Sequence, residues 1–261
     1  MAEKRIIGII PTRMGSSRFP GKPLEKIHGM PMVGHCFFRS KMSTLLSDVY
    51  IATCDQEIFD YSNEIGAKVV MTGSHHKRAT DRTAEAVLKI EEDTGSSIDI
   101  VVMIQGDEPM IYPDMIDAVV SPLIEDSSIV ISNGFAPLMN RREQDDPNEV
   151  KVVIDRQGFA MYFSREPIPS WKMGAESVPM NKQVCIIPFQ RDFLLTFLDL
   201  EPTPLEIVES VDMLRAMEHG YRVKMIRMDR ETYAVDTRDD LENVESLMEH
   251  DPLMKEYIKN R

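Results

Sequence analysis

The chain has 261 residues, of which 43% are hydrophobic and 28% charged, so it contains enough apolar material for a folded core and is not a disordered polypeptide. Its formal net charge of −13 argues against binding of nucleic-acid polymers and against docking on an anionic membrane. A phosphorylated ligand is compatible with that charge if a local cluster of basic residues binds it.

The cysteines and the N-terminus indicate the compartment. Cys36, Cys54 and Cys185 are far apart, so we expect buried thiols and no disulfide framework. The apolar run from Ile6 to Ile10 is too short for a signal peptide, and no stretch approaches the ~20 apolar residues of a membrane span. We therefore expect a cytoplasmic protein without a membrane segment.

Short apolar runs alternate with helical patterns in the first half of the chain. Strands are predicted over 5–10, 49–53, 68–72 and 99–109, and helices over 31–46, 56–65 and 81–92. This alternation predicts an α/β fold with a mostly parallel sheet flanked by helices. Such sheets bind ligands beyond the carboxyl ends of their strands, where residues 11–22 and 105–109 lie.

The second half reads differently. Its patterns predict strands over 128–138, 150–165, 183–189 and 221–228, and helices over 203–219 and 238–249. Residues 164–181 have no clear periodicity and contain the only tryptophan, Trp171. A segment of this kind is typical of a lid, a partner-binding arm or a disordered loop.

Three cations, Arg13, Arg18 and Lys22, follow the first predicted strand within the stretch PTRMGSSRFPGKPL. Backbone amides near Gly15 and Gly21, together with fork-like arginines, suit a polyphosphate. The alternative is a solvated basic turn, and composition alone does not separate the two. The position after the first strand favours the anion site. The stretch is not a Walker A loop, because Pro follows its Gly-Lys pair.

Two acidic motifs also lie at predicted loop positions. Asp107 and, less strongly, Glu108 end the fourth strand, and Mg²⁺ is commonly held by one or two carboxylates plus substrate phosphates. Asp107 could equally be a solvated turn acid or a helix cap. Asp236 precedes the last predicted helix, which it could cap, as could Thr237 or Asp239. Sequence spacing does not establish that Asp236 meets Asp107.

The histidines show little pattern. The run from His75 to Arg78 could bind an anion, but a charged loop is the simpler interpretation. The remaining histidines have no metal-ligand spacing; they are His28, His35, His219 and His250.

Taken together, these segments resemble the 3-deoxy-manno-octulosonate (Kdo) cytidylyltransferase family of sugar-acid cytidylyltransferases, from about Ile6 to Leu247. The stretches that carry the resemblance are IIPTRMGSSRFPGKPL, MTGSHHKRATDRTAEA, VMIQGDEPMI, NEVKVVIDRQGFAMYFSREPIP, PTPLEIVESVDMLR and AVDTRDDLENV. The resemblance implies one nucleotidyltransferase domain with a Rossmann-like core and a smaller mixed region. Residues 1–125 and 220–250 would mainly bind nucleotide, and 126–219 would mainly bind the sugar and form dimer contacts.

The resemblance also implies a reaction, in which the anomeric hydroxyl of a 3-deoxy sugar acid attacks CTP to give a CMP-sugar and diphosphate. Arg18, Lys22, Asp107 and Asp236 would be catalytic, and the two aspartates would hold Mg²⁺. The implied nucleotide-binding residues are Pro11, Thr12, Arg13, Arg18, Lys22, Arg78, Ala79, Arg82 and Gln105. The implied sugar-binding residues are Gln105, Arg165, Gln183, Glu206 and Glu209. A homodimer is implied as well, with 164–181 as its arm.

This sequence departs from the family pattern in two places. Gln183 to Phe189 stands where the family commonly has a His-Leu-Gly-Ile-Tyr-Gly-Tyr-like stretch, and Arg78-Ala79 replaces Ser-Gly. Three hypotheses follow: a cytidylyltransferase for Kdo, the same chemistry on a different or modified sugar acid, or a non-catalytic nucleotide-binding homologue. The presence of Lys22, Asp107 and Asp236 argues against the third.

Overall fold

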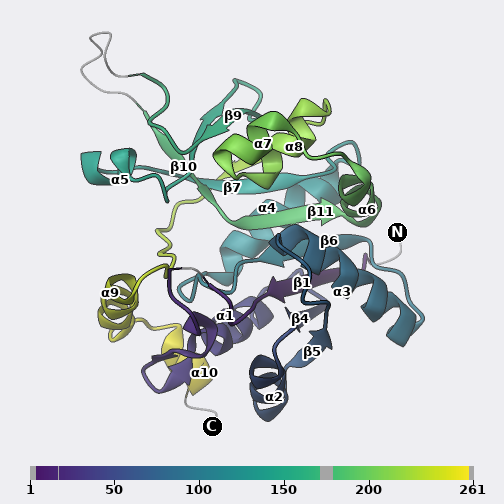
Figure 1. Ribbon diagram of the computed structural model, residues 1–261, viewed down its shortest axis with the longest axis vertical. Coiled ribbons are helices and arrows are strands. Elements are labelled where there is room, and N and C mark those ends of the chain that lie inside the picture. The colour runs from purple at the N-terminus through teal and green to yellow at the C-terminus, as the bar shows by residue number, and fades with distance from the viewer. Residues whose placement is uncertain (1–3, 17, 171–178, 259–261) are drawn as a thin grey trace. The chain divides into compact units, whose positions relative to one another are not determined.

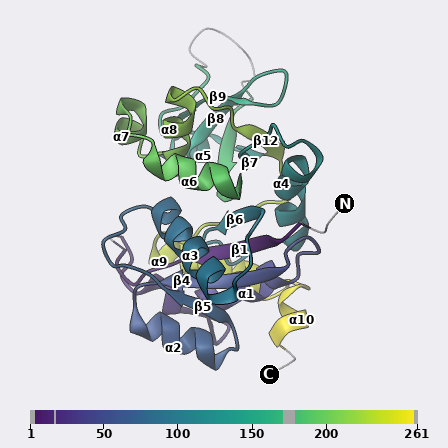
Figure 2. The ribbon, with the colours of Figure 1, turned by 90° about the vertical axis from the view of Figure 1, so that its right-hand side faces the viewer.

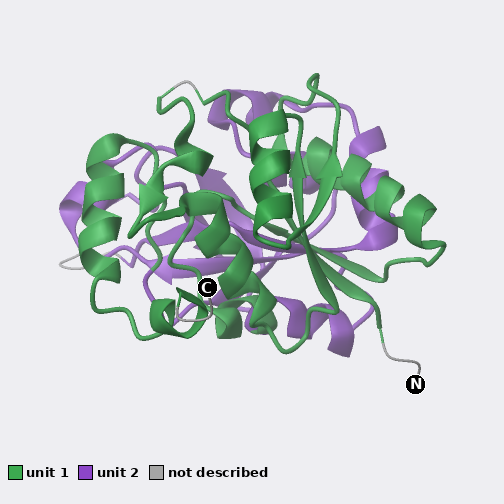
Figure 3. Ribbon diagram, turned by 90° about the horizontal axis from the view of Figure 1, so that it is seen from below, with its two compact units in different colours: residues 1–117, 232–261 green, residues 118–231 purple. Residues whose placement is uncertain are grey.

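The computed structural model describes residues 4–16, 18–170 and 179–258. The chain forms two compact units (Figure 3): unit 1 comprises residues 1–117 and 232–261, and unit 2 comprises residues 118–231. The sequence predicted parts that divide at 125/126 and 219/220 within one domain. The roles assigned to those parts stay predictions.

Unit 1 is built on four parallel strands in the order β6-β1-β4-β5 (Figure 1). They are β1 (Ile6–Pro11), β4 (Asp48–Thr53), β5 (Lys68–Met71) and β6 (Ile100–Ile104). Every residue of β1 and β6 is buried. A parallel strand covered on both faces needs a continuous apolar run, which is why these strands were predictable from sequence.

Helices cover both faces of these strands. α1 (Met32–Lys41) and α3 (Ala79–Thr94) pack against opposite faces, as right-handed crossovers require (Figure 1). α2 (Gln56–Glu64) packs against β4 and β5 (Figure 2). The predicted α/β fold with a mostly parallel sheet is confirmed for this unit.

The last segment of the chain returns to unit 1 through an apolar stripe. α9 (Arg238–Met248) buries Leu241, Val244 and Met248, which lie on one helical face. They join a core cluster with Phe19 from the loop after β1. The same cluster takes in the short strands β2 (Lys26–Ile27) and β3 (Met30–Pro31) and the helix α10 (Met254–Ile258). This packing holds the segment before α9 beside the loop that follows β1.

Unit 2 contains a mixed five-stranded sheet in the order β12-β7-β10-β8-β9. Among the strands that the structure describes, only the β12–β7 pair in this sheet is parallel. Its strands are β7 (Ser132–Pro137), β8 (Lys151–Ile154), β9 (Ala160–Ser164), β10 (Asn181–Val184) and β12 (Lys224–Arg227). The unit also contains the strand β11 (Ile186–Gln190) and the helices α5 (Arg141–Asp145), α6 (Arg191–Asp199), α7 (Pro204–Glu209) and α8 (Asp212–Glu218).

Three predicted elements of unit 2 are each interrupted. The helix predicted over 203–219 is two helices, because Ser210 adopts a left-handed φ of 53° at the end of α7. The strand predicted over 150–165 is a hairpin, β8 and β9, that turns through Gly158 at φ 79°. The strand predicted over 183–189 is β10 followed by β11. The pattern of hydrophobic residues alone does not show where these elements are interrupted.

The helices α4 (Pro113–Glu125) and α6 were not predicted. α4 carries Pro122 inside it, which counts against a helix locally. Its apolar residues are nevertheless buried in the pattern of a helical face: Met115, Ile116, Val119, Val120 and Leu123. Tertiary burial therefore outweighs the local signal.

Other expectations concern thiols, membranes and the arm. The three cysteines are free thiols; Cys36 is buried as expected, whereas Cys54 and Cys185 are only partly buried. Among the described residues, no helix is both long and apolar enough to cross a membrane. The arm predicted over 164–181 lies partly outside the described residues, as does Trp171. Its role in a dimer stays a prediction.

His35 is a buried imidazole that anchors the C-terminal segment. Its Nδ1 contacts the Tyr257 hydroxyl at 2.7 Å and its Nε2 the Ile27 carbonyl at 2.9 Å. Burial, with help from the nearby Arg39 charge, lowers the pKa of His35 from 6.5 to about 4. The unfolded chain therefore takes up this proton below pH 6.5 while the folded chain resists it.

We expect the free energy of unfolding to fall as the pH drops from 6.5 towards 4, because His35 is protonated more readily in the unfolded chain. Between pH 7 and pH 5 its contribution to the free energy of unfolding should drop by about 2 kcal/mol. Urea unfolding of wild type and His35→Gln at both pH values measures it, because the variant should lose that part of the pH dependence. His250→Gln, at an exposed histidine, should behave as wild type. An unchanged pH slope in His35→Gln would contradict the assignment.

Candidate active site

The loop after β1 is held close to the sheet by backbone contacts. The Met14 amide donates to the Asp55 carboxylate at 2.7 Å, and the Met14 carbonyl accepts from the Gly21 amide at 2.9 Å. Gly21 has a φ of 80°, a conformation that favours glycine. The next residue, Lys22, begins a short 3-10 helix with Pro23 in its first turn. The loop thereby turns Lys22 back towards the carboxyl end of β6.

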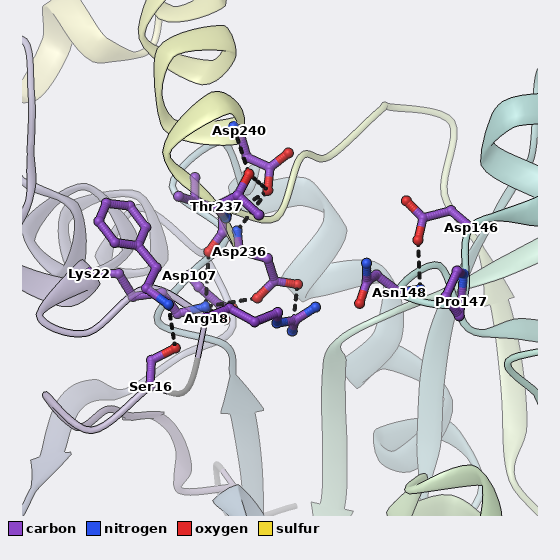
Figure 4. Close-up of polar contacts among 12 residues, drawn as sticks. Ser16, Arg18, Lys22, Asp107, Asp146, Pro147, Asn148, Asp236, Thr237 and Asp240 are labelled. Carbon is purple, nitrogen blue, oxygen red and sulfur yellow. Dashed lines mark hydrogen bonds and ion pairs between the residues drawn. The ribbon is translucent and has the colours of Figure 1, made fainter.

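Lys22 joins the two aspartates that the sequence could not place together (Figure 4). Its Nζ lies 2.6 Å from Asp107 Oδ2 and 3.0 Å from Asp236 Oδ1. It also donates to the Val235 carbonyl at 2.9 Å. Arg18 pairs with the other oxygen of Asp236 at 2.9 Å. Four predicted catalytic residues therefore form one ionic cluster within unit 1.

Asp236 does not cap α9. Thr237 is the N-cap, and its side chain accepts from the Asp240 amide at 3.2 Å. The Asp240 carboxylate in turn accepts from the backbone amides of Asp236 and Thr237 (Figure 4). A second tie comes from the Val235 amide, which donates to the Asp107 carbonyl at 2.8 Å. The capping box therefore leaves the Asp236 side chain available to Lys22 and Arg18.

The opposite wall comes from the segment between β5 and the start of α3. Arg82 is only 3% exposed, and its Nη1 donates to the Thr72 hydroxyl and to the Gly73 carbonyl. Its Nη2 is buried with no hydrogen-bond partner among the described residues. A buried guanidinium nitrogen without a partner is costly, so this donor is suited to a ligand. Arg13 reaches the same segment, donating to the His76 carbonyl at 3.3 Å.

These walls enclose a cavity of about 290 Å³ within unit 1, which is close to the lower end of small-ligand sites. All the predicted nucleotide and metal residues line it: Pro11, Thr12, Arg13, Arg18, Lys22, Arg78, Ala79, Arg82, Gln105, Asp107 and Asp236. Their individual roles stay predictions. The cavity agrees with the expectation that residues at the carboxyl ends of neighbouring parallel strands converge.

The structure adds lining residues that were not assigned to the site. They are Gly15, Ser16, Pro23, His76, Lys77 and Gly106. The run from His75 to Arg78 was interpreted mainly as a charged surface loop. This run follows β5, which is a parallel strand beside β4. Because ligands bind beyond the carboxyl ends of parallel strands, that position could have placed the run at the site.

The electrostatics of the cluster favour a charged lysine. Burial of Lys22 by itself disfavours the ammonium, but the attraction and hydrogen bonds of Asp107 and Asp236 prevail and raise its pKa above the usual value. Its side chain is 12% exposed, and those of Asp107 and Asp236 are 27% and 24% exposed. Lys22 therefore carries a fixed positive charge at the cavity wall.

The predicted sugar residues Arg165 and Glu209 contact each other in unit 2. Glu209 accepts from the hydroxyls of Tyr162 and Ser164 and from the Arg165 amide, at 3.2, 2.8 and 2.8 Å. The Arg165 guanidinium donates to the carbonyls of Pro147, Glu209 and Ser210. A sugar acid would have to share or replace these contacts.

Glu206 is committed to the interior of unit 2. It is 1% exposed, and its two carboxylate oxygens accept from Arg215 at 2.6 and 2.7 Å. It also completes the capping box of α7 with Thr203. This environment does not support the prediction that Glu206 borders a sugar pocket, because its carboxylate is already buried and paired.

Gln183 lies on β10 and donates from Nε2 to Asn133 Oδ1 at 2.5 Å. Asn133 is fully buried and donates in turn to the Val184 carbonyl at 2.6 Å. The residue that departs from the family pattern is therefore oriented by a buried amide.

Comparisons with known proteins show the family of the chain. A family model described as cytidylyltransferase matches residues 7–232. A 3-deoxy-manno-octulosonate cytidylyltransferase of Syntrophotalea carbinolica is 41% identical over 249 residues, covering 92% of this chain and 97% of the relative. The chain belongs to the 3-deoxy-manno-octulosonate cytidylyltransferase family.

Two further comparisons support this family assignment. The mitochondrial member from Arabidopsis thaliana is 42% identical over 248 residues, covering 94% of this chain and 83% of that protein. The solved structure of a CMP:2-keto-3-deoxy-manno-octonic acid synthetase complexed with CTP matches with a TM-score of 0.86 at 33% identity. That match covers 94% of this chain and 99% of the solved chain. The protein is thus a nucleotidyltransferase with the cytidylyltransferase fold, as predicted.

The capping box predicts that one substitution lowers both the stability of the protein and its turnover. Thr237→Ala removes the cap of α9 and should cost about 1 kcal/mol of unfolding free energy. It should also lower the turnover of CTP, because the amide contacts that hold Asp236 weaken. Asn140→Ala removes the cap of α5, where Asn140 accepts from the Glu143 amide at 3.0 Å, and should leave turnover unchanged. Equal turnover in both variants would show that the box does not position Asp236.

Proposed function

We propose that this protein transfers CMP from CTP to the anomeric hydroxyl of Kdo, with Mg²⁺ and with release of diphosphate. One observation carries the proposal: Lys22, Asp107 and Asp236 meet at the wall of a cavity that is also lined by Arg13, Arg18, Arg78 and Arg82. Within the family to which the chain belongs, this arrangement suits a nucleoside triphosphate and a divalent cation.

The substrates are inferred from the relatives. The relatives' names specify 3-deoxy-manno-octulosonate as the acceptor, and the matching solved structure holds CTP. Arg13, Arg18 and Lys22 would bind the triphosphate as cations that approach it from one loop. Backbone amides of the same loop add donors that suit phosphate oxygens.

Asp107 and Asp236 fit a magnesium ion in donor chemistry. Carboxylate oxygens are ligands that Mg²⁺ prefers, and two carboxylates plus substrate phosphates form a common magnesium set. Both accept from the single nitrogen of Lys22, so they already lie close enough to share a cation. A bound Mg²⁺ would neutralise phosphate charge and favour ionisation of the attacking hydroxyl.

The chemistry asks the protein mainly for positioning and charge. The sugar hydroxyl loses its proton to solvent and forms a bond to the α-phosphorus of CTP, the bond to the bridging oxygen breaks, and diphosphate leaves with that electron pair. Lys22 and Arg18 would stabilise the negative charge that builds on the phosphate oxygens. Arg82 would orient the nucleoside through its buried Nη2, which has no protein partner among the described residues. No covalent intermediate on the protein is needed.

Asp107→Asn and Asp236→Asn should each reduce diphosphate release by roughly 10²-fold or more, because each removes one negative ligand while retaining side-chain size. The assay uses CTP, Kdo and Mg²⁺, with circular dichroism and urea unfolding as checks on the fold. Asp239→Asn, at an exposed neighbour in the first turn of α9, is the matched control and should keep wild-type turnover.

Metal removal tests the same pair of residues. EDTA should abolish turnover in the wild type, and excess Mg²⁺ should restore it. Full activity in EDTA, or near-normal turnover in both asparagine variants, would contradict the magnesium assignment. CTP binding by calorimetry without diphosphate release across a panel of sugar acids would favour a non-catalytic homologue.

The alternative acceptor is a different or modified sugar acid, because Gln183, where the resemblance implies a histidine, has its side chain held on Asn133. We expect the kcat/KM ratio between Kdo and other 3-deoxy sugar acids to change in Gln183→His, while the CTP KM stays the same. Steady-state kinetics on a panel of acceptors measures it. A better substrate than Kdo in the wild-type panel would assign the same chemistry to a different sugar acid.

A further inference from the structure

Two histidines and a glutamate gather beside the cavity but play no part in the proposed transfer. They are His75 and His76, in the segment between β5 and α3, and Glu85, on α3. One ligand atom from each lies within 4.8 Å of the other two. The two imidazole ring centroids are 4.2 Å apart, and His76 Nε2 is in direct contact with Glu85 Oε2.

Neighbouring groups hold the Glu85 carboxylate in place and would orient it if it bound a metal ion. Its Oε1 pairs with Lys89 Nζ at 2.8 Å, and its Oε2 accepts from the Gly73 amide at 3.0 Å. Lys89 is itself fixed on the Met71 carbonyl at 2.7 Å. Partners of this kind orient a metal-binding carboxylate and sustain its affinity.

Gly73 makes room for the first imidazole. A Cβ at this position would lie 2.4 Å from Cε1 and 2.5 Å from Nδ1 of His75. A larger residue at 73 would therefore have to displace the exposed imidazole of His75. The absence of a side chain at Gly73 leaves the ring room to lie against the backbone.

We propose that His75, His76 and Glu85 bind a divalent transition-metal ion of the zinc class. Two imidazole nitrogens and one carboxylate oxygen form a donor set that suits Zn²⁺ and leaves a fourth position for water. The same set is a poor match for Mg²⁺, which prefers oxygen ligands. The site is chemically distinct from the all-oxygen pair of Asp107 and Asp236. Among the described residues, it is the one group of three histidine, cysteine or acidic side chains whose ligand atoms all lie within 4.8 Å of one another.

The ion would fasten the wall of the cavity to α3. His76 lines the cavity, and its carbonyl accepts from Arg13 at 3.3 Å. A metal bond to its side chain would therefore restrain the segment that carries Lys77 and Arg78 into the same cavity. Binding to the folded state alone also stabilises it, so the ion should raise the melting temperature.

The test is a calorimetric titration of the tag-free, metal-stripped full chain with Zn²⁺, in millimolar Mg²⁺. We expect one Zn²⁺ to bind per chain, and His75→Ala and His76→Ala should each weaken its binding at least tenfold. Glu85→Gln should weaken Zn²⁺ binding as well, since it removes the carboxylate ligand. The matched controls His219→Ala and His250→Ala, at exposed histidines, should bind as wild type.

A spectroscopic readout separates coordination from a merely structural role. Co²⁺ in the same position should show visible d–d absorption that is lost in His75→Ala, a substitution at an exposed side chain. Absence of a one-to-one complex, or histidine variants that bind like wild type, would overturn the proposal. So would binding that is lost only in Asp107→Asn and Asp236→Asn. Neither measurement uses CTP or a sugar acid, so its outcome is independent of the proposed transfer.

Discussion

The ammonium of Lys22 is the contact on which the site of unit 1 depends. It joins three parts of the chain: the loop after β1, the end of β6 through Asp107, and the returning C-terminal segment through Asp236. Two carboxylates close to each other repel unless a cation lies between them. In this protein Lys22 and Arg18 supply that charge, and their ion pairs hold both carboxylates at one cavity.

The apolar packing of α9 makes this ionic contact possible. Leu241, Val244 and Met248 bury one face of the helix against Phe19, which belongs to the same loop as Arg18 and Lys22. Burial of apolar side chains supplies the driving force, and the capping box of Thr237 and Asp240 then sets the direction of the chain at Asp236. Core and site therefore share one packing cluster, so a defect in either should affect both.

Acidic residues in unit 2 are used in internal contacts. Glu206 is neutralised by Arg215 inside unit 2, and Glu209 is used by the hydroxyls and amide that surround it. The cavity of unit 1 gathers arginines and lysines instead. A protein of net charge −13 can thus present a local basic surface, because Coulomb attraction within a few ångströms outweighs screened charges farther away.

The α/β class, the four parallel strands of unit 1 and the basic loop that follows β1 were predictable from the sequence. Continuous apolar runs such as β1 and β6 are local signals, and so are motifs whose residues lie within ten positions of one another. Only the folded structure shows that Asp236 lies beside Asp107, with Lys22 bound to both. It also shows that Thr237, and not Asp236, caps α9, and that Glu206 is buried and paired with Arg215. It also decided the break at Ser210 and the grouping of His75 and His76 with Glu85. These features join residues that lie apart in the chain or depend on one backbone angle, and packing of the whole unit sets them.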